Sequence, residues 1–253
     1  TSTCEGLVNL EPLLTGGHLS AIPIDPSGGI NTNGSGYYIS QAGNTPSISS
    51  YNNETRNVGL GPCPPTIKDL RDGNVYKTVL IGSQCWMAEN LAYDNGCSGK
   101  TWIDSTDVGW CGYHTSDTQQ QNGLLYQWSA AMNNSTTEGA QGICPAGWHL
   151  PTDEEWHTLE SYLATGTCDA SRSGGGCEPA GTALKSGGSS GWNGLLNGYF
   201  WSGTFYDFGT LGIWWSSSQA GGNAWRRLLG SSVTVNRNAN NQGNGFSVRC
   251  LKD

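Results

Sequence analysis

The stretch Gly142-Ile-Cys-Pro-Ala-Gly-Trp-His-Leu-Pro-Thr-Asp-Glu-Glu-Trp156 contains the clearest helix start in the chain. Thr152 is a favourable N-cap residue, because its hydroxyl can accept a hydrogen bond from the first helical turn. Glu155, three residues later, completes a capping box. The stretch therefore predicts a helix over residues 151–163. Its buried face is expected to carry Trp156, Leu159 and Leu163.

Outward from this helix, most of the apolar pattern is that of short strands. Residues 75–81 alternate after an Asp72-Gly73 turn signal, and residues 123–132 predict a second, short helix. Two helices followed by a Trp-rich set of strands predict an α+β fold with short, loop-rich β-sheets. The strands expected after Ala180 lie at 213–218, 224–229, 233–235 and 245–251.

The composition favours a loop-rich fold in which aromatic side chains supply much of the core. The chain has 38 Gly and 11 Trp, and only 13% of its residues are charged. A net charge of −8 argues against a nucleic-acid partner. Five basic residues and no acidic one lie between Arg226 and Lys252, and we expect some of these arginines to hold loops through carbonyl groups. No apolar run is long enough to span a membrane.

Nine cysteines, without a CxxC motif or zinc spacing, predict disulfides and an extracellular or cell-surface location. Two pairs bracket short loops that a disulfide can close, and an odd count leaves one thiol over. The predicted pairs at this stage are Cys97–Cys111, Cys168–Cys177 and Cys4–Cys63.

Residues 1–62 differ from the rest, being rich in Gly, Asn and Ser and without Trp. Residues 17–26 and 36–40 resemble the globular end of type IV pilin-like proteins. That resemblance implies a hydrophobic anchoring helix, so membrane association would depend on a segment absent from this chain. Prolines around Cys63 predict a boundary. We therefore expect a pilin-like or loop-rich segment at 1–62 and a second domain at 63–253.

Several longer motifs occur in order along the second domain. They are Asp72-Gly-Asn-Val-Tyr-Lys-Thr-Val79, Ile81-Gly-Ser-Gln-Cys-Trp-Met-Ala-Glu-Asn-Leu91, Tyr126-Gln-Trp-Ser-Ala-Ala-Met132, the 142–156 stretch, Trp214-Trp-Ser-Ser-Ser218 and Gly245-Phe-Ser-Val-Arg-Cys250. The series resembles the Fibrobacter succinogenes major paralogous domain. The resemblance implies a C-type-lectin-like fold with a Trp core and a long-range disulfide between Cys144 and Cys250. Because Cys85 stands where that motif usually has another residue, it is the candidate for the odd thiol. The expected core tryptophans are Trp148, Trp156, Trp214 and Trp215.

The Asn-rich segment Asn236-Arg-Asn-Ala-Asn-Asn-Gln-Gly-Asn-Gly245 resembles the variable proteins of diversity-generating retroelements. In those systems, Asn codons of a template are randomised and the products are displayed on a rigid scaffold. Residues near the C-terminus that depart from the usual pattern are therefore candidate ligand-binding positions. They are Phe200, Trp201, Tyr206, Asp207, Leu211, Ile213, Arg226, Leu228, Gly230, Ser231 and Ser232.

The sequence shows no catalytic constellation. Its four histidines are scattered, and His149 is expected to be a packed core residue. No nucleophile elbow appears, and the carboxylates that begin the 151–163 helix suit the helix dipole. The ligand triplets of calcium-dependent lectins are also missing. We therefore predict no catalytic residue, no metal and no cofactor.

These observations predict a non-enzymatic, surface-displayed protein that binds another protein or macromolecule through diversified residues. Ten aromatic residues fall between Trp192 and Trp225, more than one short Gly-rich stretch is expected to bury. One alternative is a structural or adhesive subunit of a pilus-like filament. A formylglycine-generating-type enzyme is another alternative, and Cys85 is its candidate reactive thiol.

Overall fold

The structure is a computed structural model that describes residues 37–42, 45–50, 63–103 and 106–253. The chain divides into two compact units, Thr1–Gly61 and Pro62–Asp253. In the first unit, β1 (Tyr37–Ala42) and β2 (Thr45–Ser50) form an antiparallel pair.

The pilin-like reading of the N-terminal segment falls mostly outside the described residues, and it stays a prediction.

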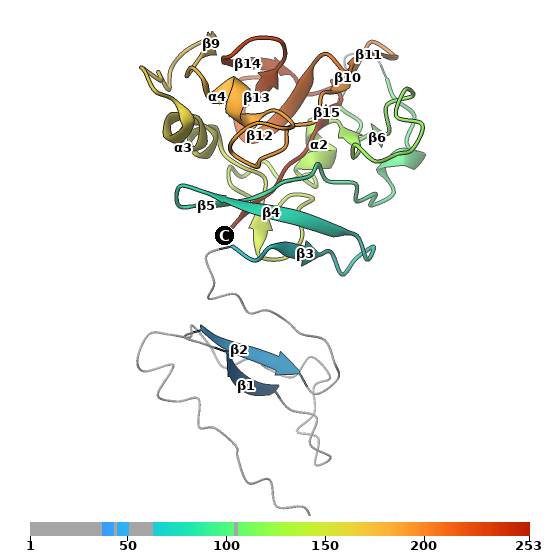
Figure 1. Ribbon diagram of the computed structural model, residues 1–253. Coiled ribbons are helices and arrows are strands. Elements are labelled where there is room, and N and C mark those ends of the chain that lie inside the picture. The colour runs from blue at the N-terminus through green and yellow to red at the C-terminus, as the bar shows by residue number, and fades with distance from the viewer. Residues whose placement is uncertain (1–36, 43–44, 51–62, 104–105) are drawn as a thin grey trace, which may run out of the picture. The chain divides into compact units, whose positions relative to one another are not determined.

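The second unit is built from two sheets that lie at its opposite ends (Figure 1). The larger has the strand order β6-β7-β15-β12-β13-β14-β9, with β10 paired to β12 and β11 paired to β10. The smaller has the order β3-β4-β5-β16-β8. The large-sheet strands are β6 (Cys111–Gly112), β7 (Leu125–Tyr126), β9 (Gly174–Gly176), β10 (Asn197–Trp201), β11 (Thr204–Phe208), β12 (Gly212–Ala220), β13 (Asn223–Leu229), β14 (Val235–Asn241) and β15 (Phe246–Ser247). The small-sheet strands are β3 (Thr66–Lys68), β4 (Val75–Ile81), β5 (Gln84–Met87), β8 (Trp148–His149) and β16 (Leu251–Lys252).

The expected α+β, C-type-lectin-like fold is wrong. Strands make up 34% of the structure and helical residues 12%, so the protein is mostly β with curled sheets. The three short α-helices of the described chain are α2 (Trp128–Ala131), α3 (Asp153–Leu163) and α4 (Ala180–Leu184), and η1 (Cys97–Gly99) is a 3₁₀ turn.

The helix expected over 123–132 explains part of this difference. Leu125 and Tyr126 form β7, which pairs with both β6 and β15, so backbone pairing on two sides takes these residues out of the helix. Only the four residues of α2 remain helical. The apolar pattern was compatible with either structure, because both faces of this segment are buried.

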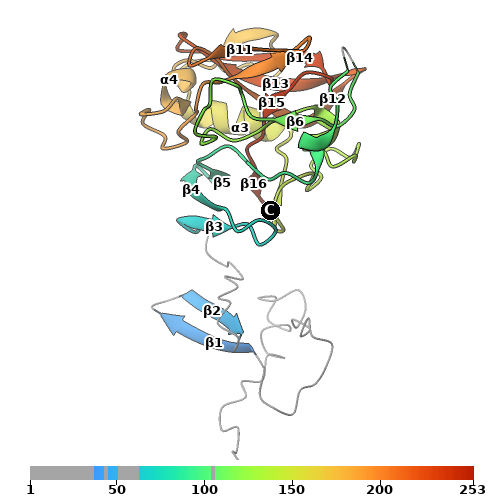
Figure 2. The same ribbon diagram turned by 90° about the vertical axis from the view of Figure 1, so that its right-hand side faces the viewer.

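The α3 helix begins as predicted. The Thr152 side chain accepts a hydrogen bond from the Glu155 N–H, and the Glu155 carboxylate accepts one from the Thr152 N–H, which completes the capping box. The helix lies against β12 and β13 (Figure 2). It buries Trp156, Leu159 and Glu160.

The strands β12 and β13 have apolar clusters on both faces. Trp214 packs with Trp156 and Trp192 on the α3 side, whereas Ile213 and Trp215 belong to the cluster on the other side. Neighbouring residues of a strand point to opposite faces, which places the two clusters on either side of one sheet. The four tryptophans expected in the core, Trp148, Trp156, Trp214 and Trp215, are all buried.

Disulfides pair all eight cysteines of the described chain. Cys144–Cys250, Cys97–Cys111 and Cys168–Cys177 form as expected. Cys63, however, pairs with Cys85, so the expected Cys4–Cys63 bond and the free thiol at Cys85 are both wrong. Cys4 itself lies outside the described residues.

The Cys144–Cys250 bond joins the loop before α3 to the chain's last segment.

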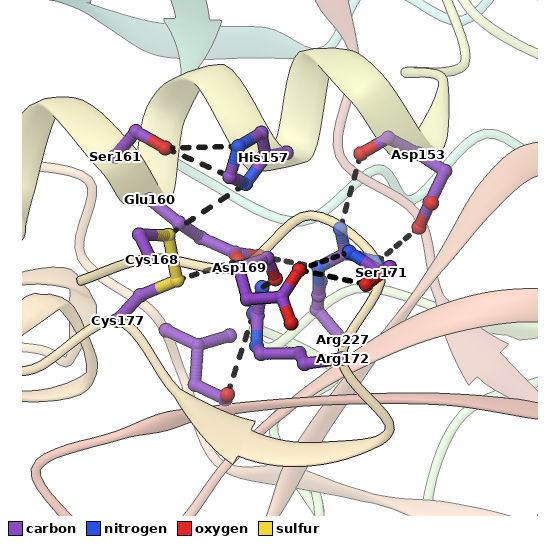
Figure 3. Close-up of a disulfide and its surroundings, with 11 residues drawn as sticks. Asp153, His157, Glu160, Ser161, Cys168, Asp169, Ser171, Arg172, Cys177 and Arg227 are labelled. Atoms are coloured by element: carbon purple, nitrogen blue, oxygen red, sulfur yellow. Dashed lines mark hydrogen bonds and ion pairs between the residues drawn. A yellow bond between two sulfur atoms is a disulfide. The ribbon is translucent and has the colours of Figure 1, made fainter.

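A buried cluster of charges connects α3 to the sheet (Figure 3). The Glu160 carboxylate accepts hydrogen bonds from Arg172 and from Arg227 on β13, and both side chains of the Glu160–Arg227 pair are fully buried. Asp153, at the first turn of the helix, binds Arg227 at 2.6 Å and Arg237 of β14 at 2.7 Å. The first turn therefore does more than complement the helix dipole, because its carboxylate fixes two strands.

Burial alone raises the pKa of Asp153. The hydrogen bond from Arg237 and the positive charge of Arg227 outweigh that effect, so the pKa is lowered.

Arg249 fixes a loop through carbonyl oxygens, as expected. Its guanidinium donates to the backbone oxygens of Trp192 and Asn193 and to Asn90 Oδ1, and it lies 3.8 Å from the centre of the Trp192 ring.

Trp214 should be among the most costly residues to truncate. Trp214→Ala removes a fully buried ring whose Nε1 donates to Asn90 Oδ1 at 2.8 Å, so we expect a loss of roughly 3–5 kcal/mol in the free energy of unfolding. Trp201→Ala is the control, because Trp201 is 50% exposed, and its cost should stay within about 1 kcal/mol. Urea titration of both variants measures the difference, and equal losses would contradict this assignment of the core.

Glu160→Gln tests the ionic connection between α3 and the sheet. Removing the carboxylate charge leaves Arg227 buried without half of its anionic partners, so the free energy of unfolding should fall by roughly 3–5 kcal/mol. Glu154→Gln on the same helix is the matched control, since Glu154 is exposed, and it should change stability by about 0.5 kcal/mol or less. A Glu160→Gln variant as stable as the control would show that the pair does not hold the helix.

Candidate ligand-binding site

A hollow of about 240 Å³ opens between the β10–β11 hairpin and the strands β12 to β14. Arg226 and Leu228 of β13 line it, whereas Arg227 between them contacts α3. Strand alternation therefore places the hollow on the face of the sheet opposite α3. Its lining residues are Tyr199, Trp201, Leu211, Ile213, Arg226, Leu228, Asn240, Asn244 and Phe246.

The Arg226 side chain reaches from β13 to the neighbouring strand β14. Its Nε donates to Asn240 Oδ1 at 2.8 Å and its Nη1 to Asn236 Oδ1 at 2.7 Å. Both amides come from β14, the strand paired with β13, and Asn238 donates to Asn236 Oδ1 at 3.1 Å. The guanidinium is therefore held by side-chain amides, and it fixes no loop through a carbonyl group.

Arg226 carries a charge that no acidic group of the described chain neutralises. The seven ion pairs among these residues do not include it. Burial, with the positive charge of the adjacent Arg227, lowers the pKa of Arg226 to about 10, so the group is still charged at neutral pH.

Aromatic residues of the β10–β11 hairpin form the outer wall. Tyr199 and Tyr206 are stacked with ring centroids 5.4 Å apart, and Trp201 lies 5.9 Å from Tyr206. The hairpin turns at Ser202 and Gly203, whose φ angles of 47° and 78° suit a two-residue turn that requires positive φ at both central residues. This tight turn places Trp201 opposite Thr204.

The structure brings six of the eleven candidate positions together. Five of them line the hollow, and the sixth, Tyr206, packs on its aromatic wall. Ile213 and Arg226 are buried, so these residues form the floor of a recess and do not stand on an exposed patch. The five lining positions are Trp201, Leu211, Ile213, Arg226 and Leu228.

The other five candidates do not line the hollow. Phe200 is a core residue stacked on Trp110 at 4.4 Å. Gly230 is buried against Leu211, because a Cβ there would meet Leu211 Cδ2 at 2.8 Å. The last three are exposed, at the end of the β10–β11 hairpin and beyond β13: Asp207, Ser231 and Ser232.

Four lining residues were missed: Tyr199, Asn240, Asn244 and Phe246. For Asn240 a signal was present, because Asn236, Asn238 and Asn240 recur every second residue and so share one face of a strand. Tyr199 and Phe246 carry no signal that separates them from core aromatics.

The described residues contain two groups that resemble metal ligand sets, and each includes a disulfide. His157 and Glu160 lie beside the Cys168–Cys177 bond (Figure 3). Asp94 lies beside the Cys97–Cys111 bond. A sulfur in a disulfide is not a thiolate, so neither set presents a cysteine thiolate ligand while its disulfide is intact.

Two histidines have structural partners. The His149 side chain is 12% exposed and lies between the carboxylates of Glu155 and Asp253, so it is packed at the edge of the core against polar partners. His114 is buried against Phe205 and Phe208. Cys85, the candidate reactive thiol, is buried in its disulfide with Cys63.

Over residues 79–252, the sequence matches the family described as the Fibrobacter succinogenes major domain. Comparisons with curated proteins and with solved structures found no similar protein. Four disulfides indicate an oxidising, extracellular or secreted environment. Within the described part of the chain, no helix has the length and apolar character needed to cross a membrane.

Metal removal should leave this protein unchanged while its disulfides are intact. Because the cysteines beside Glu160 and Asp94 are oxidised, we expect the melting temperature in excess EDTA to equal that in excess Ca²⁺ or Zn²⁺. Differential scanning calorimetry of the oxidised protein measures this. A clear fall in melting temperature on chelation would contradict the expectation and reveal a structural ion.

Proposed function

The chain belongs to the Fibrobacter succinogenes major domain family, and on this premise we propose that it is a non-enzymatic, surface-displayed protein that binds a macromolecular ligand. The hollow opposite α3 is the proposed binding site. The observation that carries the proposal is that six candidate positions from four strands and a loop meet around one recess.

The size of the recess supports a macromolecular ligand. At about 240 Å³ it is smaller than the roughly 300–1,000 Å³ of sites that enclose drug-sized molecules. A space of this size suits one anchoring side chain of a partner protein. Anchors of this kind, seated in a pocket with an aromatic and arginine lining, dominate the energetics of many protein interfaces.

The strand arrangement supports diversification at these positions. Arg226 and Leu228 face the hollow, and Arg227 between them pairs with buried Glu160. Substitutions at the first two therefore leave the ionic connection to α3 in place. We propose that the protein is the variable component of a diversity-generating retroelement and that its Asn-rich strand records the template's Asn codons.

A filament subunit remains the alternative, but its support lies in residues 1–62, most of which are outside the described chain. The formylglycine-type enzyme is not proposed, because its candidate thiol at Cys85 is disulfide-bonded.

Sequencing the gene across many clones of its source population tests the proposal. We expect amino-acid variation to concentrate at Trp201, Leu211, Ile213, Arg226 and Leu228. The matched controls are Trp214 and Arg227, which point to the opposite face from their neighbours Ile213, Arg226 and Leu228 on the same strands and should be invariant. A near-copy of the coding region beside a reverse transcriptase gene should accompany the variation.

Variation spread evenly over exposed residues, with no such repeat, would favour the filament subunit and contradict diversification at the hollow.

A further inference from the structure

Arg226 is the one charged residue that lines the hollow, and no lining residue is acidic. Arg226 is 9% exposed. Unlike the buried Arg227 and Arg237, it has no carboxylate partner in the described chain. By contrast, Arg227 and Arg237 on the opposite face each bind Asp153. A buried cation that lacks an anion is costly, and an anionic ligand group removes that cost.

The Arg226 guanidinium also has N–H groups that no group of the described chain accepts. Of its five N–H groups, one on Nε and one on Nη1 are used by Asn240 and Asn236. Nη2 donates to no group of the described chain and is not among its fully buried polar atoms that lack a partner, so it keeps access to solvent on a side chain that lines the hollow. A planar guanidinium fixed on one edge presents a fork that matches a carboxylate.

The surroundings favour a carboxylate over a phosphate. A phosphate dianion calls for a cluster of cations, and Arg226 is the one charged residue among those that line the hollow. Most of the other lining groups are apolar or aromatic, including Trp201, Leu211 and Leu228. The recess therefore offers one positive charge beside a surface for an apolar side chain.

We propose that the hollow recognises a carboxylate joined to an aromatic or branched apolar group, as in an acidic segment or C-terminus of a partner protein, with Arg226 binding the carboxylate. This inference rests on the proposed function and names the chemistry of its ligand. Asn236 and Asn240 are positioning residues that hold the guanidinium toward the hollow.

The full chain, labelled with ¹⁵N, is titrated with indole-3-propionate and, separately, with its neutral isostere indole-3-propionamide. Both probes have the same ring and length, so their difference reports the carboxylate. We expect the carboxylate to bind about tenfold tighter or more and to shift the Arg226 Nε–H and the amides of Ile213 and Leu228. Arg226→Gln should abolish that preference, while Ser231→Ala, outside the lining, should keep it.

A second variant guards against loss of folding in Arg226→Gln. Asn240→Asp places a carboxylate where an amide oxygen now lies 2.8 Å from Arg226 Nε, so the charge is neutralised inside the protein. We expect it to weaken the carboxylate probe about tenfold more than the amide probe, so that the preference for the carboxylate is lost.

Equal binding of the two probes at the hollow would overturn the carboxylate inference and leave the binding site standing. If neither probe shifts these resonances at millimolar concentration, the hollow is not an anchor site, and the proposed function falls with the inference.

Discussion

The pairing of Glu160 on α3 with Arg227 on β13 is the interaction on which the rest of the arrangement depends. Both side chains are fully buried, and Arg172, Arg237 and Asp153 complete the cluster. A buried charge is stable only beside its partner, so the pair determines which face of β13 points toward α3. Once Arg227 points toward α3, strand alternation turns its neighbours Arg226 and Leu228 the other way. The position of the hollow follows from this choice.

Two adjacent arginines thus have different tasks. Arg227 is neutralised by carboxylates and holds a helix to a sheet, whereas Arg226 is held by amides and keeps its charge available. The disulfides stabilise the fold in another way, by restricting the unfolded chain. The Cys144–Cys250 bond closes the longest loop of the four, with a sequence separation of 106. Covalent restraint and buried pairing therefore both act outside the residues that line the recess.

Sequence reasoning recovered the parts of this protein that rest on local rules. The capping box at Thr152, the β4 strand and the pairing of Cys97 with Cys111 follow from short-range patterns. It failed where tertiary context decides, because the segment at Leu125 is taken into the sheet by two neighbouring strands. The same limit applies to the site: Phe200 and Trp201 are equally aromatic neighbours, and only the packing against Trp110 makes the first a core residue.

The two hydrogen bonds from Arg226 to Asn236 and Asn240 join positions that lie ten and fourteen residues away along the chain. Residues so connected do not mutate independently. An apolar side chain at 226 leaves the amides of Asn236 and Asn240 without their shared donor, and a carboxylate at 240 neutralises the arginine's charge. The set of useful sequences at this surface is therefore smaller than the product of the choices at each position. Under the proposed function, selection would act on combinations of residues from the paired strands β13 and β14.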